Sequence, residues 1–257
     1  MPRIRIGADS INYEASGPAP LEGRCVVMIH GAGQGAACWE NQLEALKHRG
    51  RFPSAAVDLP GHGRSGGRAM DSMEGYADFV KKFCEAAGIT NPVLIGHSMG
   101  GRIAQLLALD GGVSPSGCLF AATGTRIRVS RWSLKTVLAD YRTFCETAAQ
   151  NAFGPGAPAG VREVFLKRLL STPADTSHRD LLACDGFDAS ESAGRIDVPS
   201  VIVAGGLDTL TPAKHTNALR RHIRGSKLFV IEDAGHFMMM ERPDAFNKIM
   251  IDFLNLL

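Results

Sequence analysis

The sequence lacks long hydrophobic runs and carries almost no net charge. No apolar stretch among its 257 residues approaches the length of a membrane span, and Lys and Arg outnumber Asp and Glu by only 28 to 26. A helical span needs about 20 consecutive apolar residues, and nucleic-acid binding usually needs a strongly basic face. We therefore expect neither a membrane nor a nucleic acid as a partner.

The sequence also shows no signal-peptide pattern at its start and no cysteine pairs typical of zinc sites. Residues 1–6 enter a predicted strand directly, without an apolar segment or a small-residue cleavage site, so we expect a cytoplasmic protein. None of the six cysteines forms a C-x-x-C pair, which disfavours a zinc site. Cys25 and Cys118 lie in apolar runs and are predicted to be buried thiols, with no disulfides in a reducing compartment.

What the sequence does contain is an alternation of strand and helix patterns. Strands are predicted at 3–7, 11–15, 25–29, 54–57, 93–95, 117–121, 198–204 and 227–231. The first two are joined by an expected turn at Asp9 and Ser10. Helical spacing lies at 39–48, 72–87, 102–109, 212–222 and 243–257. This alternation implies right-handed crossovers and a mostly parallel, doubly wound sheet.

The alternation stops at Thr123. From there to about Arg195 the sequence has helical segments and no convincing strand; the predicted helices cover 132–151, 161–171 and 176–184. Because the strand pattern resumes afterwards, we predict that 123–196 is a helical cap inserted into one α/β core. The core then consists of residues 1–122 and 197–257.

A serine stands between two glycines directly after the predicted strand 93–95. The G-H-S-M-G stretch around Ser98 leads into the helical run 102–109, which is the strand–turn–helix setting of a nucleophile elbow. Such a turn is too tight for side chains at the glycines, and it puts the serine hydroxyl at a helix N-terminus, where the helix dipole favours negative charge. A chain with 29 glycines can contain the pattern by chance, but the flanking strand and helix favour a nucleophile.

A serine nucleophile needs a base and an acid that orients the base. Asp208 and His236 both follow predicted strands, at the edge where open α/β sheets form their sites. The alternative for Asp208 is a helix N-cap, but Thr211 before Pro212 is the better cap. A single histidine is more often structural than catalytic. His236, however, completes the chain order Ser, Asp, His that a nucleophile elbow predicts.

Two backbone N–H groups are predicted to bind the oxyanion of a tetrahedral intermediate. One belongs to Met99, directly after the nucleophile. The other belongs to Ala32, in the glycine-rich loop that follows the predicted strand 25–29. A second glycine-rich loop contains His62, which we interpret as structural because no partner acid stands at a suitable place.

Together these motifs resemble the α/β-hydrolase family over nearly the whole chain. The resemblance is carried by H-G-A-G at 30–33 with Trp39, D-L-P-G-H-G-R-S at 58–65, G-H-S-M-G-G at 96–101, and the stretches 205–212 and 235–243. The chain looks most like the branch of esterases, enol-lactonases and cofactor-free haloperoxidases. This resemblance implies an eight-stranded, mostly parallel sheet flanked by helices, a lid after the sixth strand, and a triad of Ser98, Asp208 and His236.

The expected function is a serine hydrolase that cleaves carboxylic esters through an acyl-enzyme intermediate. Its expected partner is a small-molecule ester-type substrate, no metal or organic cofactor is required, and the oligomeric state is left open. Relatives that open epoxides or dehalogenate carry an aspartate in place of Ser98, which argues against both activities.

Two alternatives remain. The first is hydrolysis of lactones, thioesters or the C–C bonds of ring-cleavage products. Arg131 and Trp132 loosely resemble the basic and aromatic pair of C–C hydrolases, although they come early in the lid. The distant alternative is a non-catalytic binding module on the same fold, which the presence of every triad member in order disfavours.

Residues 123–150 are basic. They contain five cations (Arg126, Arg128, Arg131, Lys135 and Arg142) against Asp140 and Glu146. These cations predict either an acidic acyl group or a carrier such as coenzyme A in the substrate, or simply a solvated helix face. We favour the solvated face.

Overall fold

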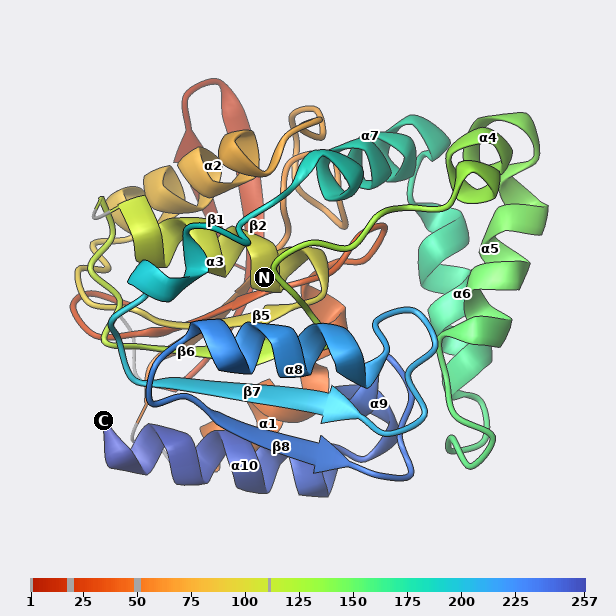
Figure 1. Ribbon diagram of the computed structural model, residues 1–257. Helices are drawn as coiled ribbons and strands as arrows, with labels where there is room; N and C mark the ends of the chain where they lie inside the picture. Colours follow the sequence, from red (N-terminus) through yellow and green to blue (C-terminus); the bar gives the residue numbers. More distant parts are fainter. Residues whose placement is uncertain (1, 18–20, 49–51, 111) are drawn as a thin grey trace.

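The computed structural model describes residues 2–17, 21–48, 52–110 and 112–257 (Figure 1). In this part of the chain, eight strands form one sheet in the order β1-β2-β4-β3-β5-β6-β7-β8. Their bounds are β1 Arg3–Ile6, β2 Asp9–Ser16, β3 Val26–Ile29, β4 Ser54–Val57, β5 Val93–His97, β6 Gly117–Ala121, β7 Ser200–Gly205 and β8 Lys227–Ile231. Strands β3 to β8 pair in parallel, whereas β2 is antiparallel to β1 and β4. The predicted α/β fold with an eight-stranded, mostly parallel sheet is confirmed.

Helices cover both faces of this sheet, which explains why its central strands are apolar along their whole length. Along β3, Val26 and Met28 belong to one hydrophobic cluster, while Val27 and Ile29 belong to the other. The first cluster includes residues of α1 (Glu40–Lys47) and α10 (Pro243–Leu256). The second includes residues of α2 (Met73–Ala86), α3 (Met99–Asp110) and α8 (Ala213–His222).

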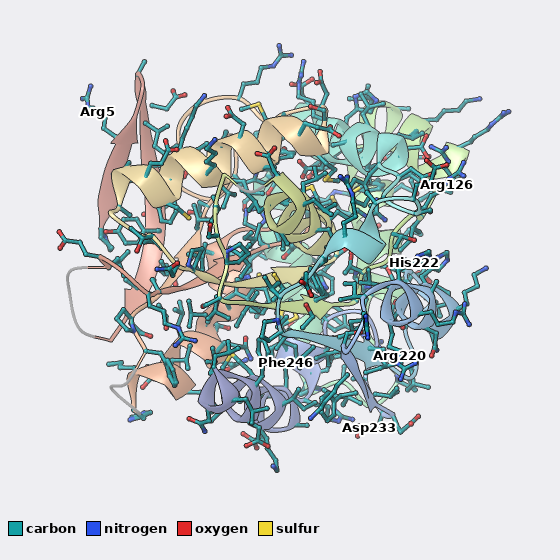
Figure 2. All side chains as sticks on the ribbon, turned by 60° about the vertical axis from the view of Figure 1, so that its left-hand side comes forward. Arg5, Arg126, Arg220, His222, Asp233 and Phe246 are labelled. Carbon is teal, nitrogen blue, oxygen red and sulfur yellow. The ribbon has the colours of Figure 1, made fainter. Side chains whose placement is uncertain are left out.

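Side chains follow this layering. Phe246 of α10 is fully buried, and its ring lies 6.1 Å from that of Trp39, at the end of the 3-10 helix η1 (Ala36–Trp39). Figure 2 shows charged side chains such as Arg5, Arg126 and Asp233 at the periphery, where all three are exposed. All six cysteines are buried free thiols, including Cys25 and Cys118 as predicted.

Two expected element boundaries are wrong. The turn between β1 and β2 lies at Gly7 and Ala8 rather than at Asp9 and Ser10, because Ile6 pairs with Asp9 and Gly7 supplies the positive φ of 59° that the turn requires. The long helix predicted at 132–151 is two helices, α4 (Arg131–Ala139) and α5 (Tyr141–Asn151). Asp140 separates them and caps α5, since its carboxylate accepts the Thr143 N–H at 3.1 Å.

Four α-helices stand between β6 and β7, namely α4, α5, α6 (Val161–Ser171) and α7 (Ala174–Gly186), and the short 3-10 helix η2 (Ala193–Arg195) follows them. No strand interrupts them, and all of residues 112–257 are described. They lie beyond the end of the sheet toward which the arrows of β7 and β8 point (Figure 1). The division into a cap at 123–196 and a core at 1–122 and 197–257 stays a prediction, and residues 1, 18–20, 49–51 and 111 of that core lie outside the described residues.

None of the helices in the described ranges has the length and the apolar character needed to cross a bilayer.

Candidate active site

Ser98 occupies the tight turn between β5 and α3. Its φ of +52° lies in the left-handed region, which non-glycine residues adopt only where the surroundings enforce it. Two hydrogen bonds fix this backbone: the Ser98 N–H donates to the carbonyl of Ala121 at 2.8 Å, and the Thr123 hydroxyl donates to the carbonyl of Ser98 at 2.9 Å. The strained position is therefore held by the end of the neighbouring strand β6 and by the segment directly after it.

The flanking glycines are required sterically. A Cβ at Gly96 would lie 2.3 Å from the carbonyl oxygen of Gly100 in α3. A Cβ at Gly100 would lie 2.1 Å from the carbonyl oxygen of Ile29 in β3. Real Cβ atoms do not approach backbone this closely, so the steric interpretation of the G-x-S-x-G pattern is confirmed.

Asp208 and His236 meet because β7 and β8 are parallel neighbours whose carboxyl ends lie side by side. His236 Nδ1 lies 2.8 Å from Asp208 Oδ2, and both side chains are buried. The other oxygen, Oδ1, accepts the N–H groups of Leu210 and Thr211, each at 2.8 Å. Burial opposes ionisation of Asp208, but the charge and hydrogen bond of His236, with these N–H groups, hold its pKa below the usual value.

The expected role of Thr211 as the helix cap is wrong. Helix α8 begins at Ala213 with Pro212 at the capping position, and no side chain there accepts a hydrogen bond. Thr211 instead donates its own N–H to Asp208. Asp208 does not cap α8 either: its Oδ1 accepts two N–H groups of the loop before that helix, while its Oδ2 faces His236.

The predicted oxyanion donors belong to two backbone segments near the turn. Neither the Ala32 N–H nor the Met99 N–H has an acceptor in the described part of the chain. The loop of Ala32 is fixed by its neighbour Gly33, whose N–H donates to Asp180 Oδ2 at 2.8 Å and whose carbonyl accepts the Thr172 hydroxyl at 3.0 Å. Both partners come from the helical segment between β6 and β7.

A cavity of about 420 Å³ is lined by Ser98, His236 and Ala32. Its size is typical of small-molecule sites. The helical segment lines it with apolar side chains, including Trp132, Phe144, Phe165, Leu169 and Leu181. No hydrogen bond joins the Ser98 hydroxyl to His236 among the described residues, and such contacts often tighten only when substrate binds. The structure thus brings the three predicted residues to one place, and their catalytic roles stay predictions.

His97 is a site residue that the sequence analysis misses. Its Nε2–H donates to the carbonyl of His236 at 3.0 Å, and the two rings lie 4.7 Å apart. Burial, with the charge of His236, lowers the pKa of His97 well below the usual value, so this imidazole is neutral. The G-x-S-x-G pattern leaves the position before the serine unspecified, so the sequence carries no signal that predicts such a contact.

The statement that His62 has no partner acid is wrong. His62 Nε2 lies 2.8 Å from Asp180 Oδ2, and its Nδ1 lies 3.0 Å from the carbonyl of Pro60. The hydroxyl of Tyr76 donates to the other oxygen of Asp180. Burial opposes protonation, but the charge and hydrogen bond of Asp180 raise the pKa of His62. The sequence conceals this pair because Asp180 comes 118 positions later, on α7.

Asp58, in the same glycine-rich loop as His62, joins three backbone or side-chain donors. It accepts the Ala36 N–H at 2.6 Å, the Arg64 N–H at 2.9 Å and the Asn12 side-chain amide at 2.8 Å. The structural interpretation of this loop is therefore confirmed. Within the ranges that the structure describes, no three or more His, Cys, Asp or Glu residues group in a way that suits a metal ion.

Comparisons with known proteins show the family and the fold. The model of the Alpha/beta hydrolase family matches residues 26–249. A pimeloyl-[acyl-carrier protein] methyl ester esterase of Neisseria meningitidis is 30% identical over 252 residues, covering 89% of this chain and 93% of the relative. A 2-hydroxy-6-oxo-6-phenylhexa-2,4-dienoate hydrolase of Burkholderia cepacia is 25% identical, covering 91% and 88%. The solved enol-lactonase of Burkholderia xenovorans LB400 has a TM-score of 0.89 at 22% identity, covering 99% and 100%, a likeness of fold.

Proposed function

The chain belongs to the alpha/beta hydrolase family and is a hydrolase, and we propose that it cleaves carboxylic esters with Ser98 as nucleophile. One observation carries this proposal. His236, whose Nδ1 lies 2.8 Å from Asp208 Oδ2, lines the same cavity as Ser98, the serine with positive φ. Base, orienting acid and nucleophile are the parts that acyl transfer needs.

The proposed reaction proceeds by two acyl transfers. His236 Nε2 takes the proton of the Ser98 hydroxyl while Asp208 accepts the Nδ1–H, and Ser98 Oγ attacks the ester carbonyl. The N–H groups of Ala32 and Met99 hold the oxyanion, helped by the N-terminus of α3. His236 then protonates the leaving alcohol, and water attacks the acyl-enzyme in the same way. No metal or organic cofactor takes part in these steps.

An ester is favoured as substrate by the relative at 30% identity, which is a methyl ester esterase. In this proposal residues 123–196 act as a lid, because side chains such as Phe144 and Leu181 line the cavity beside Ser98. The size of the cavity suits a small molecule.

Cleavage of a C–C bond in a ring-cleavage product is the second candidate. It is supported by the likeness to the dienoate hydrolase and by Trp132, which lines the cavity. Arg131, the other half of the expected basic and aromatic pair, is not among the residues that line it. Esters therefore stay the first candidate.

Hydrolysis of p-nitrophenyl esters from acetate to laurate tests the proposal, with the wild type, Ser98→Ala and the control Ser116→Ala measured side by side. We expect Ser98→Ala to lose at least about 10³-fold in kcat, whereas Ser116→Ala, outside the cavity, keeps the wild-type rate. A fluorophosphonate probe should label the wild type and not Ser98→Ala. Unchanged turnover in Ser98→Ala rules the assignment out, and labelling without turnover of any ester directs the search to dienoates.

A further inference from the structure

Arg102 stands one helical turn after the candidate nucleophile and lines the same cavity. Its backbone N–H donates to the carbonyl of Ser98 at 3.4 Å. The two residues are four positions apart, which corresponds to about 6 Å along a helix axis. Only 5% of the residue is exposed. A guanidinium is always charged, so a buried cation borders the active site.

No carboxylate of the described residues forms an ion pair with this cation. One terminal nitrogen of Arg102 donates to the carbonyl of Cys184 at 2.6 Å, and the other lies 3.5 Å from the carbonyl of Ile127. The Nε–H is buried and has no acceptor among the described residues. The ring of Phe187 lies 5.8 Å from the guanidinium carbon. A buried charge is costly unless an opposite charge and further hydrogen bonds compensate it, and here the described residues supply two carbonyl dipoles and an aromatic face but no carboxylate.

Among the residues that the structure describes, the charged side chains that line the cavity are also positive, without negative ones to balance them. Arg128 also lines it, and no Asp or Glu is among the described residues that do. Two other cations of the lid are exposed and paired at the surface: Arg126 with Asp188 at 3.2 Å and Arg142 with Glu146 at 3.5 Å. The solvated-face interpretation of the basic lid therefore suits Arg126 and Arg142, whereas the cations at the cavity are Arg128 and the unforeseen Arg102.

We propose that Arg102 is an anion-binding residue of the active site and that the natural substrate is an ester carrying a carboxylate. This inference rests on the proposed ester hydrolysis. A bound carboxylate supplies the missing counter-charge, and charge-assisted hydrogen bonds to guanidinium are stronger than neutral ones. The selectivity arises in the core helix α3, next to the nucleophile, and Arg128 adds to it from the lid.

A structural role competes with this proposal. Cys184 lies in the last turn of α7, and an arginine that donates to carbonyls at a helix C-terminus stabilises that end. Through Cys184 and Ile127, Arg102 also joins both connections between the lid and the core. This role explains the two carbonyl contacts. It does not explain why the buried Nε–H lacks an acceptor among the described residues, or why the cavity lining is positively charged. The two roles differ in whether the charge of the substrate matters.

The test compares kcat/KM for p-nitrophenyl esters in matched pairs: butyrate with succinate, valerate with glutarate, and caproate with adipate. We expect the wild type to prefer the carboxylate member of at least one pair. Arg102→Met should lower the ratio of kcat/KM for the carboxylate ester to that for its neutral partner about 30-fold, and Arg102→Lys should restore part of this ratio. Arg126→Met is the control, because it removes the same charge from an exposed residue of the lid outside the cavity (Figure 2).

Equal losses for both members of every pair in Arg102→Met assign Arg102 to the structural role and overturn the proposal. If that variant does not fold, calorimetric binding to the wild type decides. Glutarate should then bind about 10-fold more tightly than glutaramide, and equal affinities overturn the proposal. Binding is measured without turnover, so a wild type that hydrolyses no ester refutes the proposed function separately.

Discussion

At the scale of single residues, Asp208 shows how one carboxylate orders both a loop and an imidazole. Its Oδ1 holds two backbone N–H groups and its Oδ2 holds His236. Because the two loop hydrogen bonds restrict the rotation of the Asp208 carboxylate, they also restrict the orientation of the His236 ring that it contacts. The hydrogen bond to Nδ1 also leaves Nε2 as the basic nitrogen of a neutral imidazole.

His97 acts at the same scale through the backbone of His236. His97→Leu removes the donor at 3.0 Å and leaves the carbonyl of His236 unsatisfied. We expect kcat to fall about 10-fold with KM nearly unchanged, since a small displacement of the base weakens proton transfer more than binding. Steady-state kinetics on the best ester measure this split. His97→Gln keeps an N–H donor and should recover part of kcat, whereas a raised KM with unchanged kcat contradicts the positioning role.

Much of the candidate site could be predicted from the sequence, because its residues stand in short motifs that can be recognised locally. Ser98, Asp208 and His236 each follow a strand, and short motifs mark those positions. His97, Arg102 and Asp180 could not be predicted, because their significance depends on contacts made across the fold. Asp180 meets Gly33 from 147 positions away and His62 from 118. No spacing rule within the chain connects such residues.

At the scale of elements, buried strands were predictable because parallel strands covered on both faces are apolar throughout. All four residues of β3 and of β4 are buried, and the structure begins both within one residue of the expected position. The break between α4 and α5 was not predictable, because the helical pattern continues through Asp140. Only the hydrogen bonds from Thr143 make that aspartate a cap.

Asp180 of helix α7 contacts the core through its carboxylate, which meets the Gly33 N–H, His62 and the Tyr76 hydroxyl. Asp180→Asn removes the charge that faces the buried imidazole. We expect a loss of about 3 kcal/mol in the free energy of unfolding, together with a lower kcat, because Gly33 adjoins the oxyanion loop. Urea unfolding and ester kinetics measure the two effects.

Asp175→Asn provides the matched control on the same helix. Asp175 is exposed and pairs with Arg68 and Arg179 at the surface, where ion pairs contribute little. Equal destabilisation by both substitutions contradicts a special role for the buried carboxylate. A destabilised Asp180→Asn that retains full kcat limits the role of Asp180 to stability.

At the scale of the whole molecule, the protein buries several titratable groups whose pKa values move in different directions. Burial, and then the charge of His62, lowers the pKa of His30 from 6.5 to about 4, and burial lowers that of His97 as well. The pKa of His62 is raised by Asp180. Stability is therefore greatest where His30 and His97 are neutral while His62 is still charged, which places the optimum near neutral pH.

We expect the free energy of unfolding to decrease in acid, because folding lowers the pKa values of His30 and His97. Below pH 6.5 the unfolded chain protonates His30 and His97 while the folded protein does not, so stability falls as the pH falls toward 4. His30 alone accounts for about 3 kcal/mol of this loss. His62 affects stability on the alkaline side instead. The stabilisation that protonated His62 gives the folded protein is complete below the ordinary pKa of histidine, and it is lost as the pH rises through the raised pKa of His62. The pKa of Asp208 is lowered, so the stabilisation that its ionised carboxylate gives the folded protein is lost only in stronger acid, where this carboxylate becomes protonated.

Urea unfolding at intervals from pH 4 to pH 9 tests this balance. We expect a maximum near neutral pH, a steep decline on the acid side and a shallower decline on the alkaline side. His30→Asn removes one of the buried neutral imidazoles and should flatten the acid side, whereas His222→Asn, at an exposed histidine of α8 (Figure 2), should leave both sides unchanged. If the wild type is equally stable at pH 4.5 and pH 7, His30 and His97 are protonated at no cost, and the burial that also defines His97 beside the active site does not hold in solution.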